Sequence, residues 1–208
     1  KLCAGAFYSI SNIQYSNIAN VYENNHASIN DDVYNVTTIN PIMQSSNYTS
    51  FRYVPQGDII LPEYYNLVDD GFVTPIKDQQ DSGNCWSFAV LAALESCILK
   101  SSNFTYDLSE ENRKNLMASF SDYGWQIDVN EGGYDDMGVG YLVGWLGPIL
   151  ESQDMFDDRS SLSPLLNSIL HIQNCVYLKR ENYLDNDGIK EAILRYGAVA
   201  TGIYYSGL

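Results

Sequence analysis

The sequence is poor in basic residues. It has 11 Lys and Arg against 26 Asp and Glu, which gives a formal net charge of −15 at pH 7. Because nucleic acids and anionic membranes repel a field of this sign, we expect neither as a partner. A run of about 18 apolar residues, the length that crosses a bilayer, is also missing, so we expect no membrane span. The acidic balance is compatible with a basic substrate, but a solvated acidic surface explains it more simply.

The sequence has few cysteines, and their spacing does not indicate a metal site. The four cysteines are Cys3, Cys85, Cys97 and Cys175. No Cys-x-x-Cys pair occurs, so we expect no zinc site and no cofactor. Cys97 and Cys175 stand among apolar residues and are expected to be buried as small hydrophobic side chains.

Cys85 has a different setting, within residues 77–88, where a polar loop becomes an apolar helix. Residues 86–99 are nearly all apolar, a pattern typical of a helix buried inside a domain. The start of such a helix has unpaired N–H groups and the positive end of the macrodipole. Both favour the thiolate of Cys85, which is the nucleophilic form of a thiol. Asn84 or Ser82 is expected to cap this helix.

These residues resemble the nucleophile loop of papain-like cysteine peptidases. The matching residues are Gln79 and the run Ser82-Gly83-Asn84-Cys85-Trp86-Ser87-Phe88, with the glutamine six residues before the cysteine as in the family. Residues 61–66 and 71–77 resemble the start of the mature enzyme. Residues 131–134 resemble the family's Asn-Gly-Gly-Tyr segment, and the resemblance covers roughly residues 58–208. It implies an α+β, two-lobe papain-like fold, with the helical left lobe present and the β-rich right lobe only partly covered.

The resemblance implies a cysteine-type endopeptidase in which Cys85 forms a thioester acyl-enzyme. Gln79 and the backbone N–H of Cys85 would donate to the oxyanion. The residues expected to bind a peptide or protein substrate are Gly83, Asn84, Trp86, Gly132, Gly133, Tyr134 and Asp136. The two consecutive glycines can pair with an extended peptide, and Gly83 would let a substrate backbone approach closely. Asp136 lies near the family's specificity pocket, so the preference could differ from the usual apolar one.

The family's catalytic histidine and asparagine follow a strand that here ends near Tyr205, so the resemblance places both beyond Leu208. His26 and His171 do not stand where that histidine belongs. We therefore expect the remaining half of the peptidase on the same or a second chain, and the isolated chain to be inactive. Ser82 and Asn130 occupy the positions of a disulfide common in plant and lysosomal relatives, which indicates one lost bridge.

Residues 1–57 differ from the rest and are rich in Asn, Ser, Tyr and Ile. Their period-two alternation favours short strands with Asn-rich turns. They resemble the last rungs of an adhesin-like parallel β-helix, and a pro-segment or a linker remains an alternative. The chain begins at Lys1 without an intact signal peptide, so we expect a fragment or a processed chain. Residues 58–208 would form the peptidase domain, incomplete at its C-terminal end.

Further elements are expected along this domain. A helix begins at the N-cap Ser109 and faces Leu116, Met117 and Phe120 inward. Apolar residues at helical spacing follow over residues 137–150, and another helix runs from Asp185 or Asn186 to a stop at Gly197. Strands are expected at residues 171–178 and 198–205.

The run at residues 147–152 and the helix from Asp185 resemble a prokaryotic, surface-associated branch of the family. We therefore expect a secreted or cell-surface protein. Two other functions stay open: a papain-like adhesion or binding protein that has lost catalysis, and a related amidase or transferase.

Overall fold

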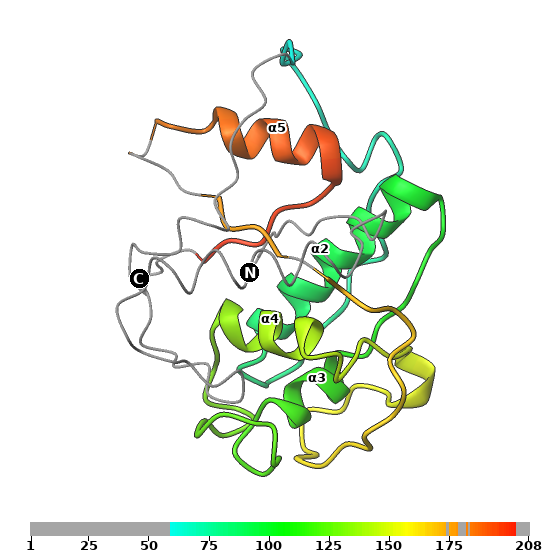
Figure 1. Ribbon diagram of the computed structural model, residues 1–208, viewed down its shortest axis with the longest axis vertical. Coiled ribbons are helices and arrows are strands. Elements are labelled where there is room, and N and C mark those ends of the chain that lie inside the picture. Colours follow the sequence, from blue (N-terminus) through cyan, green and yellow to red (C-terminus); the bar gives the residue numbers. More distant parts are fainter. Residues whose placement is uncertain (1–58, 174, 179–181, 183, 203–208) are drawn as a thin grey trace, which may run out of the picture.

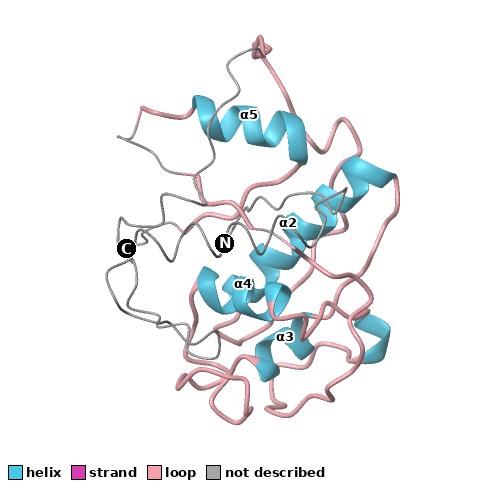
Figure 2. Cartoon of the chain, viewed as in Figure 1, coloured by secondary structure: helices cyan, strands magenta, loops and turns pink. Residues whose placement is uncertain are grey.

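A computed structural model of the chain describes residues 59–173, 175–178, 182 and 184–202 (Figure 1). The helices are α2 (Cys85–Ser102), α3 (Glu110–Leu116), α4 (Asp135–Val143) and α5 (Asp187–Tyr196), and η2 (Glu151–Gln153) is a 3-10 turn. Figure 2 draws the rest of the described chain as loops. The segment at residues 1–57 lies outside the described residues, so the β-helix, pro-segment and linker interpretations all stay predictions.

Helix α2 is the centre of the domain and contacts α3, α4 and α5. In Figure 1 it runs between α5 on one side and α3 and α4 on the other. By length and composition α2 could cross a membrane, but 61% of it is buried inside the molecule, as the core helix of a folded domain would be. Most of its residues therefore pack against the rest of the domain.

Both ends of α2 follow from local chemistry. Asn84 is the N-cap residue, and its carbonyl accepts the N–H groups of Ser87 and Phe88 at 2.9 and 3.3 Å. The expected cap through a side chain is wrong for Asn84, whose side chain makes no capping hydrogen bond. Asn103 ends the helix in the left-handed region, at φ 62°, with its N–H on the Leu99 carbonyl, a usual way to satisfy a last-turn carbonyl.

The core lies around α2. The buried apolar residues that pack together include Leu91, Leu94, Leu108, Met137, Tyr141, Leu142 and Ile172. Burying a leucine side chain fully stabilises a fold by about 1.5–3 kcal/mol, so Leu91 and Leu94 of α2 contribute substantially. Cys97 and Cys175 belong to the same core. Burial raises the pKa of both thiols to about 12, and their prediction as inert core residues is confirmed.

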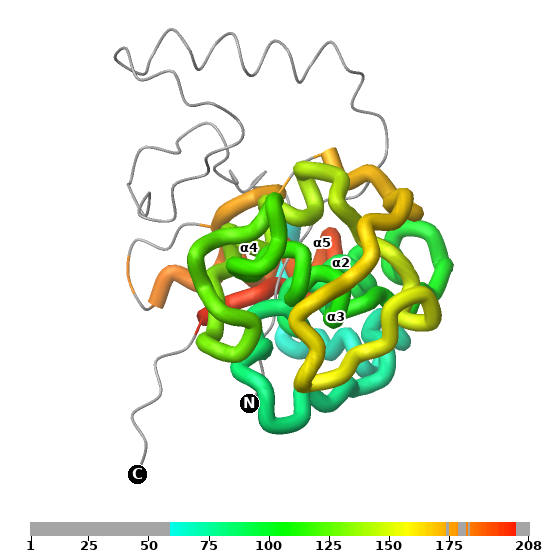
Figure 3. The backbone as a smooth tube through the Cα atoms, turned by 90° about the horizontal axis from the view of Figure 1, so that it is seen from below, coloured from blue at the N-terminus to red at the C-terminus, as the bar shows by residue number. Residues whose placement is uncertain are grey.

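Helix α3 is polar yet wholly buried. Ser109 caps it as predicted, its side chain accepting the Asn112 N–H at 3.0 Å. The loop of residues 154–164 covers α3 and receives hydrogen bonds from its side chains; Lys114 donates to the Asp157 carbonyl at 2.7 Å and Asn112 to the Pro164 carbonyl at 2.8 Å. Figure 3 shows this yellow loop passing across α3. The helix can be polar and buried because its side chains satisfy the backbone of that loop.

Two expectations around α3 have different outcomes. Leu116 and Met117 are buried as predicted. Phe120 is 62% exposed, so its predicted inward orientation is wrong. The reason is that α3 ends at Leu116, and a residue beyond the helix no longer follows the helical period that would turn it inward.

Helices α4 and α5 were located correctly, with shifted ends. The predicted helix at residues 137–150 forms over Asp135–Val143 and stops before Trp145, which has φ 58°. Helix α5 has the predicted N-cap Asn186 and ends at Gly197 with φ 115°. A side chain at Gly197 would also meet the Ser96 hydroxyl at 2.8 Å, so glycine is needed there for both conformation and space.

The predicted strands at 171–178 and 198–205 are not formed by their described residues, which run as loop apart from a single bridge residue at Tyr177. Leu108 and Leu150 make an isolated antiparallel bridge. Alternation of apolar residues specifies two faces, but a strand also needs a neighbour that exchanges hydrogen bonds with it. That requirement is not visible in one segment of sequence.

Candidate active site

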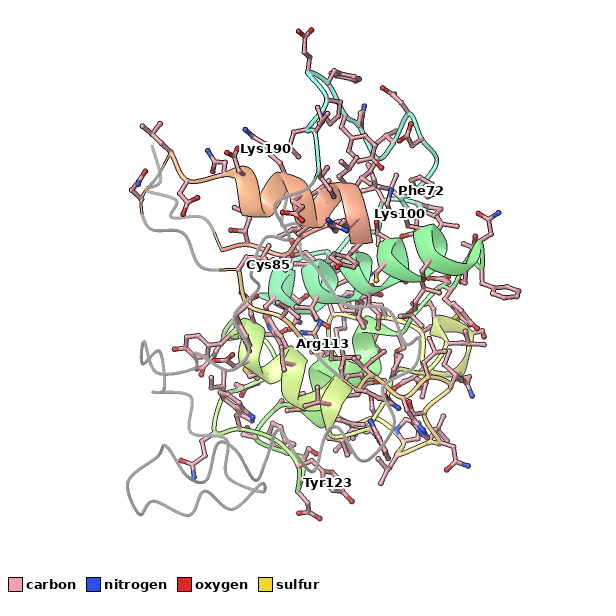
Figure 4. All side chains as sticks on the ribbon, turned by 45° about the horizontal axis from the view of Figure 1, so that its top comes forward. Phe72, Cys85, Lys100, Arg113, Tyr123 and Lys190 are labelled. Atoms are coloured by element: carbon pink, nitrogen blue, oxygen red, sulfur yellow. The ribbon has the colours of Figure 1, made fainter. Side chains whose placement is uncertain are left out.

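Cys85 is the first residue of α2, as predicted, and is free and partly exposed. Figure 4 shows it at the end of the helix. The first turn of an α-helix has N–H groups without intrahelical acceptors, and the macrodipole is positive there. The position therefore combines access from solvent with donors that stabilise a thiolate or an oxyanion.

Gln79 lies in a tight loop that precedes the helix. Its side-chain amide donates to the Ser82 carbonyl at 2.6 Å, and the Ser82 hydroxyl donates to the Gln79 carbonyl at 2.7 Å. Between them Gln80 adopts φ 53°, with its N–H on the Asp78 carboxylate at 2.8 Å. These contacts orient the Gln79 amide and leave its second N–H to donate elsewhere.

This loop is anchored by Lys77, which the sequence reasoning did not single out. The Lys77 ammonium lies 3.2 Å from the Glu95 carboxylate, 3.0 Å from that of Glu110 and 2.7 Å from that of Asp107. It also donates to the Leu108 carbonyl at 2.9 Å. One cation therefore joins the Gln79 loop to α2, to α3 and to the segment between them.

The electrostatics of this cluster are set by burial and by the mutual contact of its charges. Burial lowers the pKa of Lys77, but Glu110 and Glu95 outweigh it and hold that pKa above its ordinary value. Burial raises the pKa of Glu110 to about 8, against the lowering effect of Lys77. The sequence contained a signal for this charged cluster, because Glu95 is the single acidic residue in the largely apolar α2.

A glycine wall stands beside the first turn of α2. A Cβ on Gly133 would lie 2.6 Å from Cε2 of Trp86, and one on Gly83 would lie 2.5 Å from the Asn130 carbonyl oxygen. Gly132 adopts φ 89° and has open space around it. The residues flanking Cys85 and the predicted peptide-binding glycines are thus adjacent in space. The close approach at Gly83 is made by the chain's own backbone, at Asn130 and Gly132.

Two predicted substrate-binding side chains are inside the protein. Trp86 is 5% exposed, and the side chain of Asn84 is fully buried. Substrate binding by these two residues stays a prediction. Trp86 supports the wall from within, where it contacts Gly133 and the Arg113 guanidinium.

The acidic end of α4 forms a further part of the site. Tyr134, 53% exposed, precedes the helix, and the Asp136 carboxylate accepts the Tyr177 hydroxyl at 2.5 Å. The sequence reasoning named Tyr134 and Asp136 but missed Tyr177. No local signal could have indicated a partner 41 residues away.

His171 is stacked on Trp145, with ring centroids 4.5 Å apart and an interplanar angle of 17°. The Trp145 indole N–H donates to the neighbouring Ile172 carbonyl at 3.0 Å. In the described part of the chain no three His, Cys, Asp or Glu side chains are grouped so that they could hold a metal ion.

A thiol at the start of a buried helix, with a glycine wall beside it, is the kind of site that thiol-dependent enzymes use. The chain belongs to the papain family of cysteine proteases, whose family model matches residues 61–204.

Individual relatives are similar over shorter stretches. The viral cathepsin of Heliothis zea nuclear polyhedrosis virus is 46% identical over 54 residues, covering 26% of this chain and 15% of that protein. The thiol protease aleurain of Arabidopsis thaliana is 36% identical over 64 residues, covering 31% and 18%. The matched stretches therefore span less than a fifth of either relative.

One solved structure supports the fold, and a second match is weaker. One from a study of the mite allergens Blo t 1 and Der p 1 superposes with a TM-score of 0.60 at 18% identity, covering 74% of this chain and 51% of that one. The Clostridial cysteine protease Cwp84 matches at 33% identity and a TM-score of 0.44, covering 49% and 25%. The predicted papain-like fold, with its helical lobe present, is confirmed.

Proposed function

We propose that this chain carries the nucleophile of a cysteine endopeptidase and that Cys85 is that nucleophile. The observation that carries the proposal is the position of Cys85: a free, partly exposed thiol at the first residue of α2, beside the glycine wall. The Cys85 thiolate attacks the peptide carbonyl, and a C–S bond forms. The C–N bond then breaks, the amine leaves with a proton from an imidazolium, and water hydrolyses the thioester.

The oxyanion formed in this attack would accept the backbone N–H of Cys85 and the second N–H of the Gln79 amide. The substrate backbone would pair with Gly132 and Gly133, which present main chain without side chains. The imidazole and the asparagine that orients it would come from the remaining half of the peptidase, on the same polypeptide or a second chain.

Substrate preference and setting are further parts of the proposal. Tyr134 and Asp136 would line the specificity pocket, with Asp136 held by Tyr177, which favours a preference other than a purely apolar one. A secreted or cell-surface location, in the prokaryotic branch of the family, is supported by the resemblance of residues 147–152 and of the helix that follows Asp185.

The test combines chemical labelling with hydrolysis. The full-length protein is treated with iodoacetamide across a pH series, and alkylation is read per cysteine by mass spectrometry. We expect Cys85 to react well before Cys97 and Cys175, which are buried. The protein should also cleave a peptide library. Cys85→Ala should abolish cleavage, while the matched variant Cys97→Ala should retain it.

Other outcomes favour the alternatives. A folded full-length protein that cleaves no peptide, with Cys85 no more reactive than Cys97, would support the adhesion or binding protein that has lost catalysis. A reactive Cys85 with activity only on non-peptide amides or in acyl transfer would support the amidase or transferase.

A further inference from the structure

Arg113 is the most unusual charged group in the domain. It lies on α3, labelled in Figure 4, and is fully buried with 0% exposure. Its Nη1 donates to the Ser87 carbonyl at 2.6 Å, whereas its Nε and Nη2 have no hydrogen-bond partner. Burial lowers its pKa to about 9, so the guanidinium is still charged at neutral pH.

The guanidinium contacts the first turn of α2 and the indole behind the glycine wall. Ser87 belongs to the first turn of α2, two residues after Cys85. The guanidinium carbon lies 4.9 Å from the ring of Trp86, the same indole against which Gly133 packs. On α4, a Cβ at Gly138 would fall 1.4 Å from Nη2, so that helix approaches Arg113 through a residue without a side chain.

This arrangement is costly for stability. A buried charge with one hydrogen bond loses most of its hydration, and replacing such groups by apolar residues of similar size is often neutral or stabilising. The Ser87 carbonyl does not depend on Arg113, because the helical pattern pairs it with the N–H of Leu91. The Asp135 carboxylate attracts the guanidinium only through space.

We infer that Arg113 is a positioning residue for peptide cleavage: by holding Ser87 and Trp86 it fixes the turn that carries Cys85 against the Gly133 wall. This inference rests on the proposed function. The charge serves the geometry of the site and not the stability of the fold, and the two roles predict opposite effects of its removal.

The experiment compares Arg113→Met, which keeps length and removes charge, with Arg113→Lys, which keeps charge and loses the planar donor. Arg159→Met is the matched control, because that side chain is 92% exposed. All are made in the full-length protein. The measurements are the urea midpoint of unfolding, the iodoacetamide rate at Cys85 with Cys97 as internal reference, and kcat and KM for a peptide.

Arg113→Met should unfold at the same or a higher urea concentration than the native protein. Its kcat should fall on the order of 10–100-fold, the effect of a small displacement of reacting groups, with KM changed less than about twofold. Alkylation of Cys85 should slow by a factor of about three or more, since the turn that carries the thiol is no longer held in place. Arg113→Lys should restore part of kcat, and Arg159→Met should match the native protein.

The inference is overturned if Arg113→Met unfolds at a clearly lower urea concentration or does not fold, because the guanidinium would then be structural. It is also overturned if kcat and the Cys85 alkylation rate are both unchanged. If the native protein cleaves no peptide and Cys85 alkylation still slows in Arg113→Met, the proposed function fails and the positioning role stands. If the native protein cleaves peptides and Arg113→Met does so equally well, the proposed function stands and the positioning role fails.

Discussion

Replacing Glu110 by glutamine should remove much of the pH dependence of this domain's stability. Burial raises the pKa of Glu110 from 4.5 to about 8, despite the Lys77 ammonium 3.0 Å away. Between these two values the folded protein holds a proton that the unfolded chain has released. The free energy of unfolding therefore falls as the pH rises from about 4.5 to 8, and the stabilisation is fully present only at lower pH.

The magnitude follows from the size of the shift. One pKa unit corresponds to about 1.4 kcal/mol, so a shift of roughly 3.5 units is worth on the order of 5 kcal/mol at pH 8. Glutamine cannot ionise, and its amide oxygen can still accept from Lys77. Glu111 and Glu151, whose pKa values burial also raises, leave a smaller slope of the same sign in the variant.

The assay is urea unfolding followed by tryptophan fluorescence at pH 5, 6, 7 and 8. Glu63→Gln is the matched control, because Glu63 is exposed. The native protein and Glu63→Gln should lose stability steadily over this range, while Glu110→Gln should lose much less. A native stability that is flat or rises from pH 5 to 8, or an equal slope in Glu110→Gln, would refute the reasoning.

Two further substitutions test other parts of the site. His171→Ala removes the stack on Trp145 and should destabilise the domain by about 0.5–1.5 kcal/mol. The full-length variant should still cleave peptides. Loss of cleavage in a folded variant would instead make His171 catalytic. Gly133→Ala places a Cβ 2.6 Å from Trp86 and should lower the free energy of unfolding by roughly 1–3 kcal/mol together with the cleavage rate. Gly202→Ala, which meets nothing within 4 Å, is its control and should change neither; equal effects in both would contradict a packed wall.

Local signals in the sequence predicted the helices well. The change from polar loop to apolar run located the start of α2 at Cys85, Ser109 marked the start of α3, and Gly197 marked the end of α5. Each of these depends on a few neighbouring residues. The side-chain cap expected at Asn84 failed because its carbonyl alone begins the helix and its amide turns inside.

Contacts between distant segments were not predictable in the same way. Glu111 and Lys114 of α3 are buried together, 2.8 Å apart, beneath the loop of residues 154–164, and their charge does not predict this burial. Charge predicts exposure unless a partner is known, and here the partner is the backbone of a loop over 40 residues away. For the same reason, the contact of Arg113 with Trp86 could not be predicted from the sequence.

Burial of basic side chains also limits where other peptidases can cleave the folded chain. Trypsin-like enzymes cut after Lys or Arg in exposed, extended segments. Arg113 and Lys114 are inside the core, and Lys77 is held by three carboxylates. Among the described residues, Arg159 is the one basic residue that is both exposed and outside a helix. The described part of the domain therefore presents few scissile bonds to a tryptic neighbour, and the contacts that hold these basic side chains also protect that part from digestion.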